Sequence, residues 1–216
     1  MTRVAIPAGT VALEGVLEVP AGARGAVAFS HGSGSGRHSP RNRYVAAELR
    51  KRALATLLFD LLTPEEDRAR ENRFDIALLT ERLAAAVRFL GAEPATRGLP
   101  IGLFGASTGA ASALRVAAAM PQQVAAVVSR GGRPDLAGPQ ALARVRAPTL
   151  LIVGALDHGV IELNEEAHKA LAHCTRELAL VPGATHLFEE PGALQAVARL
   201  AADWFERHLT APARHR

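Results

Sequence analysis

Short apolar segments that alternate with longer helical segments constrain the fold of this chain most. Runs rich in valine, isoleucine and leucine, bounded by glycine or proline, recur between stretches with helical periodicity. This alternation is typical of a largely parallel sheet, because parallel strands are joined by helical crossovers. The core strands are expected at 25–30, 54–59, 100–104, 124–129, 149–153 and 176–181. We therefore predict an α/β fold.

The remaining segments complete this prediction. Two opening segments, 4–6 and 11–19, alternate well enough to form an antiparallel start. A polar connection is expected at 65–72, and Pro191 is expected in the first turn of a final helix that ends near Leu209. The other helices are expected at 41–52, 74–90, 110–120, 136–145 and 162–173, and a solvated tail at 210–216. No repeat or second core is visible, so we predict one domain, 1–216.

Charge and composition narrow the classes of function. The positive charge comes almost entirely from scattered arginines, and aromatic residues make up 4% of the chain. Nucleic-acid binders usually gather basic residues on one face, often with aromatic residues for stacking, so no nucleic-acid partner is expected. No apolar run approaches the roughly 20 residues that cross a bilayer. We therefore expect a soluble protein without a membrane partner. Because Cys174 is the only cysteine, no internal disulfide is possible, and we expect a cytoplasmic location.

The segment GASTG, residues 105–109, is the most informative chemical motif. The apolar strand PIGLF precedes it and a helix of small residues follows it, as a nucleophile elbow requires. Gly105 and Gly109 leave room where a side chain would clash with a neighbouring element. We predict that Ser107 is a nucleophile. The alternative is a serine that caps a helix in a glycine turn.

A nucleophilic serine needs a histidine base and an acid that orients the histidine. In this type of fold the chain order is serine, acid, histidine. Asp157 and His186 come just after the last two predicted strands, so both are expected at the sheet edge that carries Ser107. Glu162 and Asp135 remain as fallback acids. The other histidines considered are expected to be structural or solvated: His31, His158, His168, His173, His208 and His215.

The glycine-rich loop HGSGSG, residues 31–36, follows the first core strand. Acyl transfer needs two amide donors for the developing oxyanion, one of them from the residue after the nucleophile. We assign the N–H groups of Thr108 and Ser33, with Gly34 as the alternative. The even glycine spacing does not match GxGxxG, and no Gly-Lys-Ser or Gly-Lys-Thr occurs, so no nucleotide cofactor is expected. HExxH and CxxC are also absent, so no metal is expected.

The motifs HGSGSG, GASTG, GALDHGV and GATHLFEEPG extend in this order over nearly the whole chain. Together they resemble the α/β-hydrolase superfamily and, within it, dienelactone-hydrolase-like proteins. The resemblance implies an eight-stranded, mostly parallel sheet flanked by helices, a Ser-His-Asp triad, no cofactor and an acyl-enzyme mechanism. Dienelactone hydrolases proper carry cysteine where this chain has Ser107. Lids in this superfamily usually follow the sixth strand, where only 130–145 is present, so no large cap domain is expected.

We therefore expect a serine hydrolase of small carboxylic esters, thioesters or lactones. The same triad permits amidase, acyltransferase or perhydrolase chemistry, and the fold also permits a noncatalytic ligand-binding module. Arg130 and Arg133 follow a strand at the predicted active edge, where they are expected to pair with a substrate carboxylate or another anion. The alternative is that both are solvent-facing turn residues. The physiological substrate and the oligomeric state are left open by these motifs.

Overall fold

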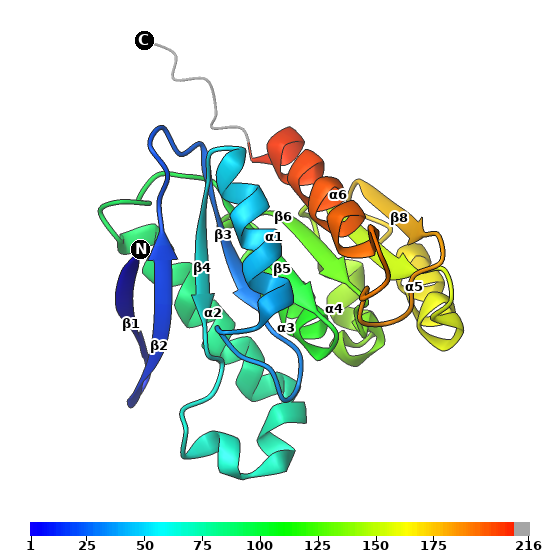
Figure 1. Cartoon of the computed structure of the whole chain (residues 1–216). Helices are drawn as coiled ribbons and strands as arrows, with labels where there is room; N and C mark the ends of the chain where they lie inside the picture. Colours follow the sequence, from blue (N-terminus) through cyan, green and yellow to red (C-terminus); the bar gives the residue numbers. More distant parts are fainter. Residues whose placement is uncertain (210–216) are drawn as a thin grey trace.

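One eight-stranded sheet runs through the molecule (Figure 1). The computed structural model describes residues 1–209, and the predicted tail lies outside them. The strand order is β1-β2-β4-β3-β5-β6-β7-β8. The strands are β1 (Thr2–Ala8), β2 (Val11–Glu18), β3 (Gly25–Ser30), β4 (Leu54–Phe59), β5 (Ile101–Ala106), β6 (Val124–Arg130), β7 (Thr149–Gly154) and β8 (Arg176–Val181).

The pairing of the strands follows the sequence pattern. β1 pairs antiparallel with β2, and β2 pairs antiparallel with β4. All other neighbouring pairs, from β4–β3 to β7–β8, are parallel. The carboxyl ends of the parallel strands therefore meet at one edge of the sheet, the lower edge in Figure 1. The predicted mostly parallel α/β architecture is confirmed.

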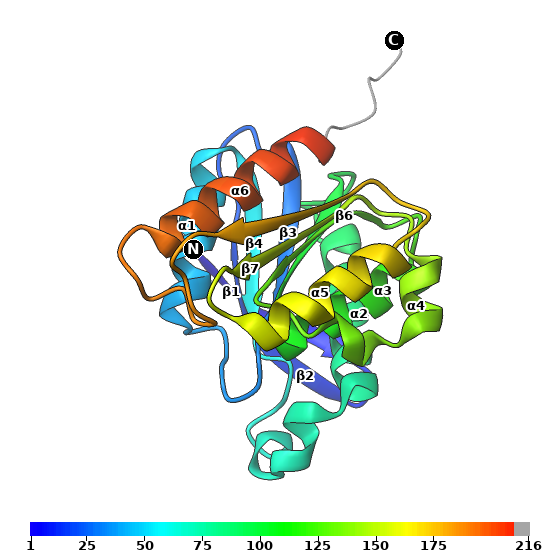
Figure 2. The same cartoon turned by 90° about the vertical axis from the view of Figure 1, so that its right-hand side faces the viewer.

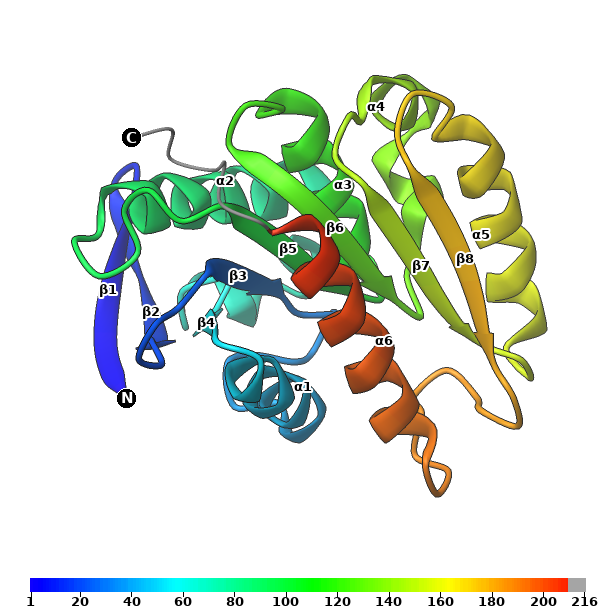
Figure 3. The same ribbon diagram turned by 90° about the horizontal axis from the view of Figure 1, so that it is seen from above.

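Helices cover both faces of the sheet (Figures 2 and 3). One face carries α1 (Pro40–Lys51) and α6 (Ala193–His208). The other face carries α2 (Ile76–Ala92), α3 (Thr108–Ala119), α4 (Pro139–Arg144) and α5 (His158–Ala170). Every residue of β3, β4, β5 and β7 is buried. This two-sided burial is the reason why these strands are almost continuously apolar.

Two helix predictions need correction. Gly192, in the left-handed conformation with φ 82°, caps α6, so the helix begins at Ala193 and Pro191 precedes it. The single helix expected at 136–145 is interrupted at Gly138, which has φ 85°. A short 3-10 helix, η3 (Pro134–Ala137), comes before this glycine, and α4 comes after it. Glycine adopts such positive φ values without steric cost, which periodicity alone does not reveal.

The segment after β4 is more ordered than the expected polar connection. It contains two 3-10 helices, η1 (Glu66–Arg68) and η2 (Arg70–Phe74), and it projects from the carboxyl edge of the sheet (Figure 1). This projecting segment is too short to form a cap domain, and so is the segment after β6, which contains only η3 and α4. Among the helices of residues 1–209, none combines the length and hydropathy needed to span a bilayer.

Candidate active site

Ser107 stands at the sharp turn between β5 and α3. Its backbone has φ 50° and ψ −121°, a region that residues other than glycine rarely occupy. A Cβ atom added at Gly109 would overlap the Ser30 carbonyl oxygen, and one added at Gly105 would lie 2.8 Å from the Ala110 nitrogen. The two glycines therefore allow the strand, turn and helix to pack closely. Ser107 itself is half-buried and reaches the carboxyl edge of the sheet.

Asp157 and His186 meet at the same edge. Asp157 Oδ2 lies 2.7 Å from His186 Nδ1, and the two side chains are 16% and 38% exposed. Although Asp157 is the N-cap residue of α5, its side chain makes no capping hydrogen bond, so the carboxylate is used for the histidine. This contact fixes the orientation of the ring and leaves Nε2 for a second partner. Of the two fallback acids, Asp135 instead pairs with Arg133.

The connection after β6 links the elbow to the histidine loop. The Ser107 N–H donates to the Arg130 carbonyl at 3.2 Å, and the Arg133 N–H donates to the Ser107 carbonyl at 3.0 Å. Gly131 lies between Arg130 and Arg133 in the chain, and a Cβ atom added to it would lie 3.5 Å from His186 Cε1. Within residues 1–209 the Ser107 hydroxyl and the His186 ring are not hydrogen-bonded to each other. Such bonds often tighten only when substrate binds.

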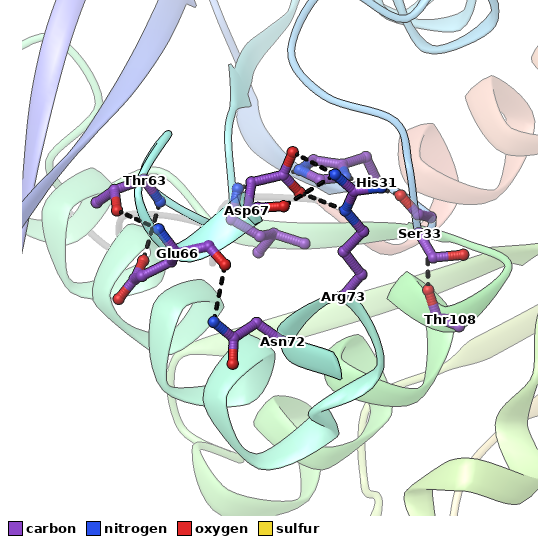
Figure 4. Close-up of polar contacts among 10 residues, drawn as sticks. His31, Ser33, Thr63, Glu66, Asp67, Asn72, Arg73 and Thr108 are labelled. Atoms are coloured by element: carbon purple, nitrogen blue, oxygen red, sulfur yellow. Dashed lines mark hydrogen bonds and ion pairs between the residues drawn. The ribbon is translucent and has the colours of Figure 1, made fainter. Parts of the chain in front are cut away.

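The two predicted oxyanion donors are joined by a hydrogen bond. The Ser33 N–H donates to Thr108 Oγ1 at 3.0 Å (Figure 4). The Thr108 N–H belongs to the first turn of α3, where the helix supplies no acceptor. An added Cβ at Gly32 would lie 3.1 Å from Ser107 Cβ, so the glycine loop packs directly against the nucleophile. Gly34, the alternative donor, adopts φ 70° in this loop.

The segment after β4 also borders the glycine loop, a contact that the sequence did not predict. Arg73 donates two hydrogen bonds to the Asp67 carboxylate, from Nε to Oδ1 at 2.7 Å and from Nη2 to Oδ2 at 2.9 Å, and a third from Nη2 to the Asp67 carbonyl at 2.8 Å. Figure 4 shows Arg73 extended toward Ser33 and His31, and these four residues line one narrow cleft. A polar, aperiodic stretch gives no signal for such a contact, because it forms between segments far apart in the chain.

His31 is a structural histidine of the glycine loop. Its Nε2 accepts the Leu61 N–H at 3.0 Å, and its Nδ1 contacts the Gly32 carbonyl at 3.0 Å. Burial lowers the pKa of His31, which favours the neutral ring that this pattern of bonds needs. The loop after β3 is thereby tied to the chain after β4.

The two predicted anion-binding arginines differ. Arg133 forms a bidentate pair with Asp135, with contacts of 2.9 and 2.8 Å. Arg130 is buried and has no such partner among the described residues. The structure therefore leaves the charge of Arg130, rather than that of Arg133, without a counter-ion.

The site is an open edge rather than a deep cavity. Two hollows of about 540 and 650 Å³ lie elsewhere, one beside α2, α3 and α4 and the other between β2 and α1. Neither is lined by Ser107 or His186. In the part of the chain that the structure describes, no three His, Cys, Asp or Glu side chains cluster in a way that could hold a metal ion.

Comparison with known proteins places this geometry in a family context. Residues 46–211 match the model of the dienelactone hydrolase family. The crystal structure of dienelactone hydrolase from Anabaena variabilis ATCC 29413 is 55% identical, with a TM-score of 0.94 over 96% of this chain and 97% of that chain. Est1E from Butyrivibrio proteoclasticus, solved with ferulic acid, is 16% identical, with a TM-score of 0.81 over 95% and 98% of the two chains. At that identity Est1E shows the shared fold alone.

Two curated proteins from Mycobacterium tuberculosis strains CDC 1551 and H37Rv are also similar. Both are named as candidate phosphoribosyl transferases, and each is 59% identical over 212 residues. The match covers 97% of this chain and 47% of each relative. The chain thus spans about half the length of these curated relatives.

Proposed function

Because this chain belongs to the dienelactone hydrolase family, we propose that it is a serine hydrolase of small carboxylic esters, thioesters or lactones. The observation that carries the proposal is the 2.7 Å contact between Asp157 and His186 at the sheet edge of the Ser107 elbow. The strained backbone of Ser107 supports it, because such conformations cluster at functional sites. A merely structural serine would not need that conformation.

In the proposed acylation step, Ser107 Oγ attacks the carbonyl carbon while His186 Nε2 takes the hydroxyl proton. The carbonyl oxygen becomes an oxyanion that accepts hydrogen bonds from the Thr108 N–H and from the Ser33 or Gly34 N–H. The Ser33 N–H, which donates to Thr108 Oγ1 in the free protein, would have to be shared between that hydroxyl and the oxyanion, whereas the Gly34 N–H would not. The positive end of α3 adds to this stabilisation. The bond to the leaving group then breaks, and the leaving group takes the proton from His186. Asp157 stabilises the charged imidazole through Nδ1–H.

In the proposed deacylation step, water attacks the acyl-enzyme carbonyl. His186 takes a proton from this water and returns it to Ser107 Oγ as the acid is released. Acylation and deacylation together convert one ester and one water molecule into one acid and one alcohol. The glycine-loop amide, the nucleophile, the acid and the base come from the loops after β3, β5, β7 and β8, respectively. The carboxyl ends of these strands meet at one edge of the sheet.

The small size of the proposed substrate is supported by the open edge, which offers no long tunnel for an acyl chain. We further propose that residues 1–216 form one domain, since all eight strands join one sheet. The single cysteine supports action in the cytoplasm.

Replacing the nucleophile tests the proposal. Ser107→Ala should reduce the hydrolysis of p-nitrophenyl acetate by several powers of ten, since triad knockouts in a serine protease cost about 10⁶ in kcat. A fluorophosphonate probe should label the wild-type protein on Ser107 and leave the variant unlabelled. Unchanged turnover in Ser107→Ala, or a wild-type protein that resists the probe, would reject the assignment.

Cys174→Ala is the matched control, because it removes the single thiol of the chain, the other side chain with the chemistry of an acyl-accepting nucleophile. Burial raises the pKa of the Cys174 thiol, which disfavours the reactive thiolate. The half-buried Cys174 lies just after α5, away from the elbow. Activity and probe labelling should therefore be the same in Cys174→Ala as in the wild-type protein.

A further inference from the structure

A buried asparagine on α5 is bonded to the connection after β6. Asn164 is 0% exposed, although asparagine side chains are mostly exposed in proteins. Its Nδ2 donates to the Gly132 carbonyl at 3.0 Å and to the Val160 carbonyl, one turn back on the same helix, at 2.8 Å. Both amide protons are therefore used. Among residues 1–209 the Gly132 carbonyl accepts no other hydrogen bond.

The side-chain oxygen of the same residue lowers the stability of the fold. Asn164 Oδ1 is buried and has no hydrogen-bond partner among the described residues. An unpaired buried acceptor is unfavourable, and asparagine is also a poor residue for the interior of a helix. An apolar side chain of similar size would avoid both costs, but it could not bind the Gly132 carbonyl. Stability alone therefore does not explain an asparagine at this position.

The connection that accepts this bond contacts both the proposed nucleophile and the proposed base. The Arg130 carbonyl accepts the Ser107 N–H at 3.2 Å, and the Arg133 N–H donates to the Ser107 carbonyl at 3.0 Å. A Cβ atom added to Gly131 would lie 3.2 Å from the carbonyl oxygen of His186 and 3.5 Å from Cε1 of its ring. A shift of this connection would therefore move the two groups that exchange a proton.

Gly132 is enclosed between α5 and the helix of the elbow, which lie on the same face of the sheet (Figure 2). A Cβ atom added to Gly132 would overlap Ser129 Oγ and lie 2.6 Å from Cβ of Ala110, the third residue of α3. Gly131 and Gly132 have no side chains that could anchor their backbone, so hydrogen bonds must hold it. The Gly131 N–H donates to the Ile152 carbonyl of β7 at 2.7 Å, and the asparagine supplies the bond at Gly132.

We propose that Asn164 is a positioning residue of the active site. Its amide holds the Gly132 carbonyl and thereby the connection against which Ser107 and His186 lie. Because Asp157 is the N-cap residue of α5, the same bond joins the helix of the acid to the connection that contacts the nucleophile and the base. The effect of Asn164 on the rate rests on the proposed function, whereas its effect on the orientation of the histidine does not.

Two substitutions separate this bond from the packing of the helix. Asn164→Leu keeps most of the side-chain volume and removes the donor. Asn164→Ser keeps a hydroxyl that can bond to the Val160 carbonyl, as serine does within helices, but its side chain is too short to reach Gly132. Both should lower kcat for p-nitrophenyl acetate about 10-fold and leave KM nearly unchanged, because misaligned reacting groups weaken the transition state more than substrate binding.

Thr96→Val is the matched control, because it also removes a side-chain donor from a backbone carbonyl in the interior. Thr96 is 1% exposed, and its Oγ1 donates to the Leu90 carbonyl at 2.7 Å. It precedes β5, at the edge of the sheet opposite the active site. Thr96→Val should lower the Tm, as the loss of a buried hydrogen bond does, and keep the wild-type kcat. A loss of kcat equal to that of Asn164→Leu would assign the effect to general destabilisation and overturn the positioning role.

The Nδ1–H proton of His186 gives a measurement that needs no catalysis. Its NMR resonance depends on the hydrogen bond to Asp157 and therefore on the orientation of the ring. The resonance should move in Asn164→Leu and Asn164→Ser and keep its wild-type position in Thr96→Val. If the wild-type protein hydrolyses no ester and the resonance still moves with Asn164, the proposed function is rejected and the positioning of His186 is supported.

The positioning role is overturned if both Asn164 variants match the wild-type protein in kcat and in the His186 resonance. It is also overturned if KM rises while kcat and the resonance stay unchanged, since that result assigns the residue to substrate binding. Should Asn164→Leu fail to fold, Asn164→Ser carries the same test, because it introduces no extra volume and keeps the bond within the helix.

Discussion

Thr108 connects the two amides that are proposed to bind the oxyanion. Thr108 is 5% exposed; it supplies one of these amides, and its hydroxyl accepts a hydrogen bond from the other, the Ser33 N–H, at 3.0 Å. A hydroxyl has two acceptor sites and one proton, so this bond leaves its proton free to donate. The surrounding loop contains Gly32, Gly34 and Gly36 and gains little rigidity from its own residues. We infer that the Thr108 hydroxyl positions the Ser33 amide.

Thr108→Val should therefore lower kcat about 10-fold and leave KM nearly unchanged, because a mispositioned donor weakens the transition state more than the ground state. The free energy of unfolding should fall by about 1 kcal/mol through the lost hydrogen bond. Steady-state kinetics and urea unfolding measure the two effects. Thr108→Ser keeps the hydroxyl and should restore kcat. A Thr108→Ser variant as slow as Thr108→Val would contradict the positioning role.

The sequence predicted the contact of Asp157 with His186 because chain order and strand ends determine which side chains share an edge. It did not predict the partner of Arg133, which turns back to Asp135 two residues later. Nor did it predict that Arg41 reaches Glu189, 148 residues along the chain. Side-chain pairing of long, flexible arginines depends on packing between elements, and no local pattern records it.

At the scale of elements, the elbow depends on close contact between three of them. β5, α3 and the end of β3 approach so closely that the backbone at Gly109 contacts the Ser30 carbonyl region. The small residues of α3 that follow, such as Ala110 and Ala111, are fully buried in this contact. A side chain at Gly109 would therefore require backbone movement rather than a change of rotamer.

Gly109→Ala should lower the free energy of unfolding by about 3 kcal/mol, the upper range for overpacking, and should abolish hydrolysis. Chemical denaturation checks the first effect. Gly91→Ala is the control, since Gly91 lies exposed in α2 and an added Cβ meets no atom within 4 Å. Alanine should stabilise that helix by up to about 1 kcal/mol. Equal stability of Gly109→Ala and the wild-type protein would refute the close contact.

The elements themselves were predictable to different degrees. Buried parallel strands are nearly continuous apolar runs, so β3 to β8 were predicted within two residues at each end. The break at Gly138 and the cap at Gly192 depend on positive φ values, which glycine permits but does not require. The 3-10 helices after β4 are held by side-chain contacts such as Arg73 with Asp67, so periodicity gave no sign of them.

At the scale of the whole molecule, a neutral histidine helps to hold two loops of the carboxyl edge together, beside the contact of Arg37 with Asp60. His31, from the loop after β3, accepts the Leu61 N–H from the chain after β4. The two strands are neighbours in the sheet, and their loops carry the glycine-rich donors and the Arg73 segment. A protonated His31 has no lone pair for the Leu61 N–H, so acid should weaken both the loop arrangement and the fold.

The stability of the whole molecule should therefore decrease as the pH falls below about 6.5. Burial lowers the pKa of His31 in the folded chain, while the unfolded chain keeps the ordinary value near 6.5. The unfolded state consequently binds more protons between these two values, which favours unfolding as the pH falls through that interval. Burial and Arg207 also lower the pKa of His208, which adds an effect of the same sign.

Urea midpoints measured from pH 7.5 to 5.5 should show this decline in stability. His31→Gln should reduce the decline, because the amide oxygen of glutamine can accept the Leu61 N–H without titrating. The same pH dependence in His31→Gln as in the wild-type protein would exclude His31 as its source.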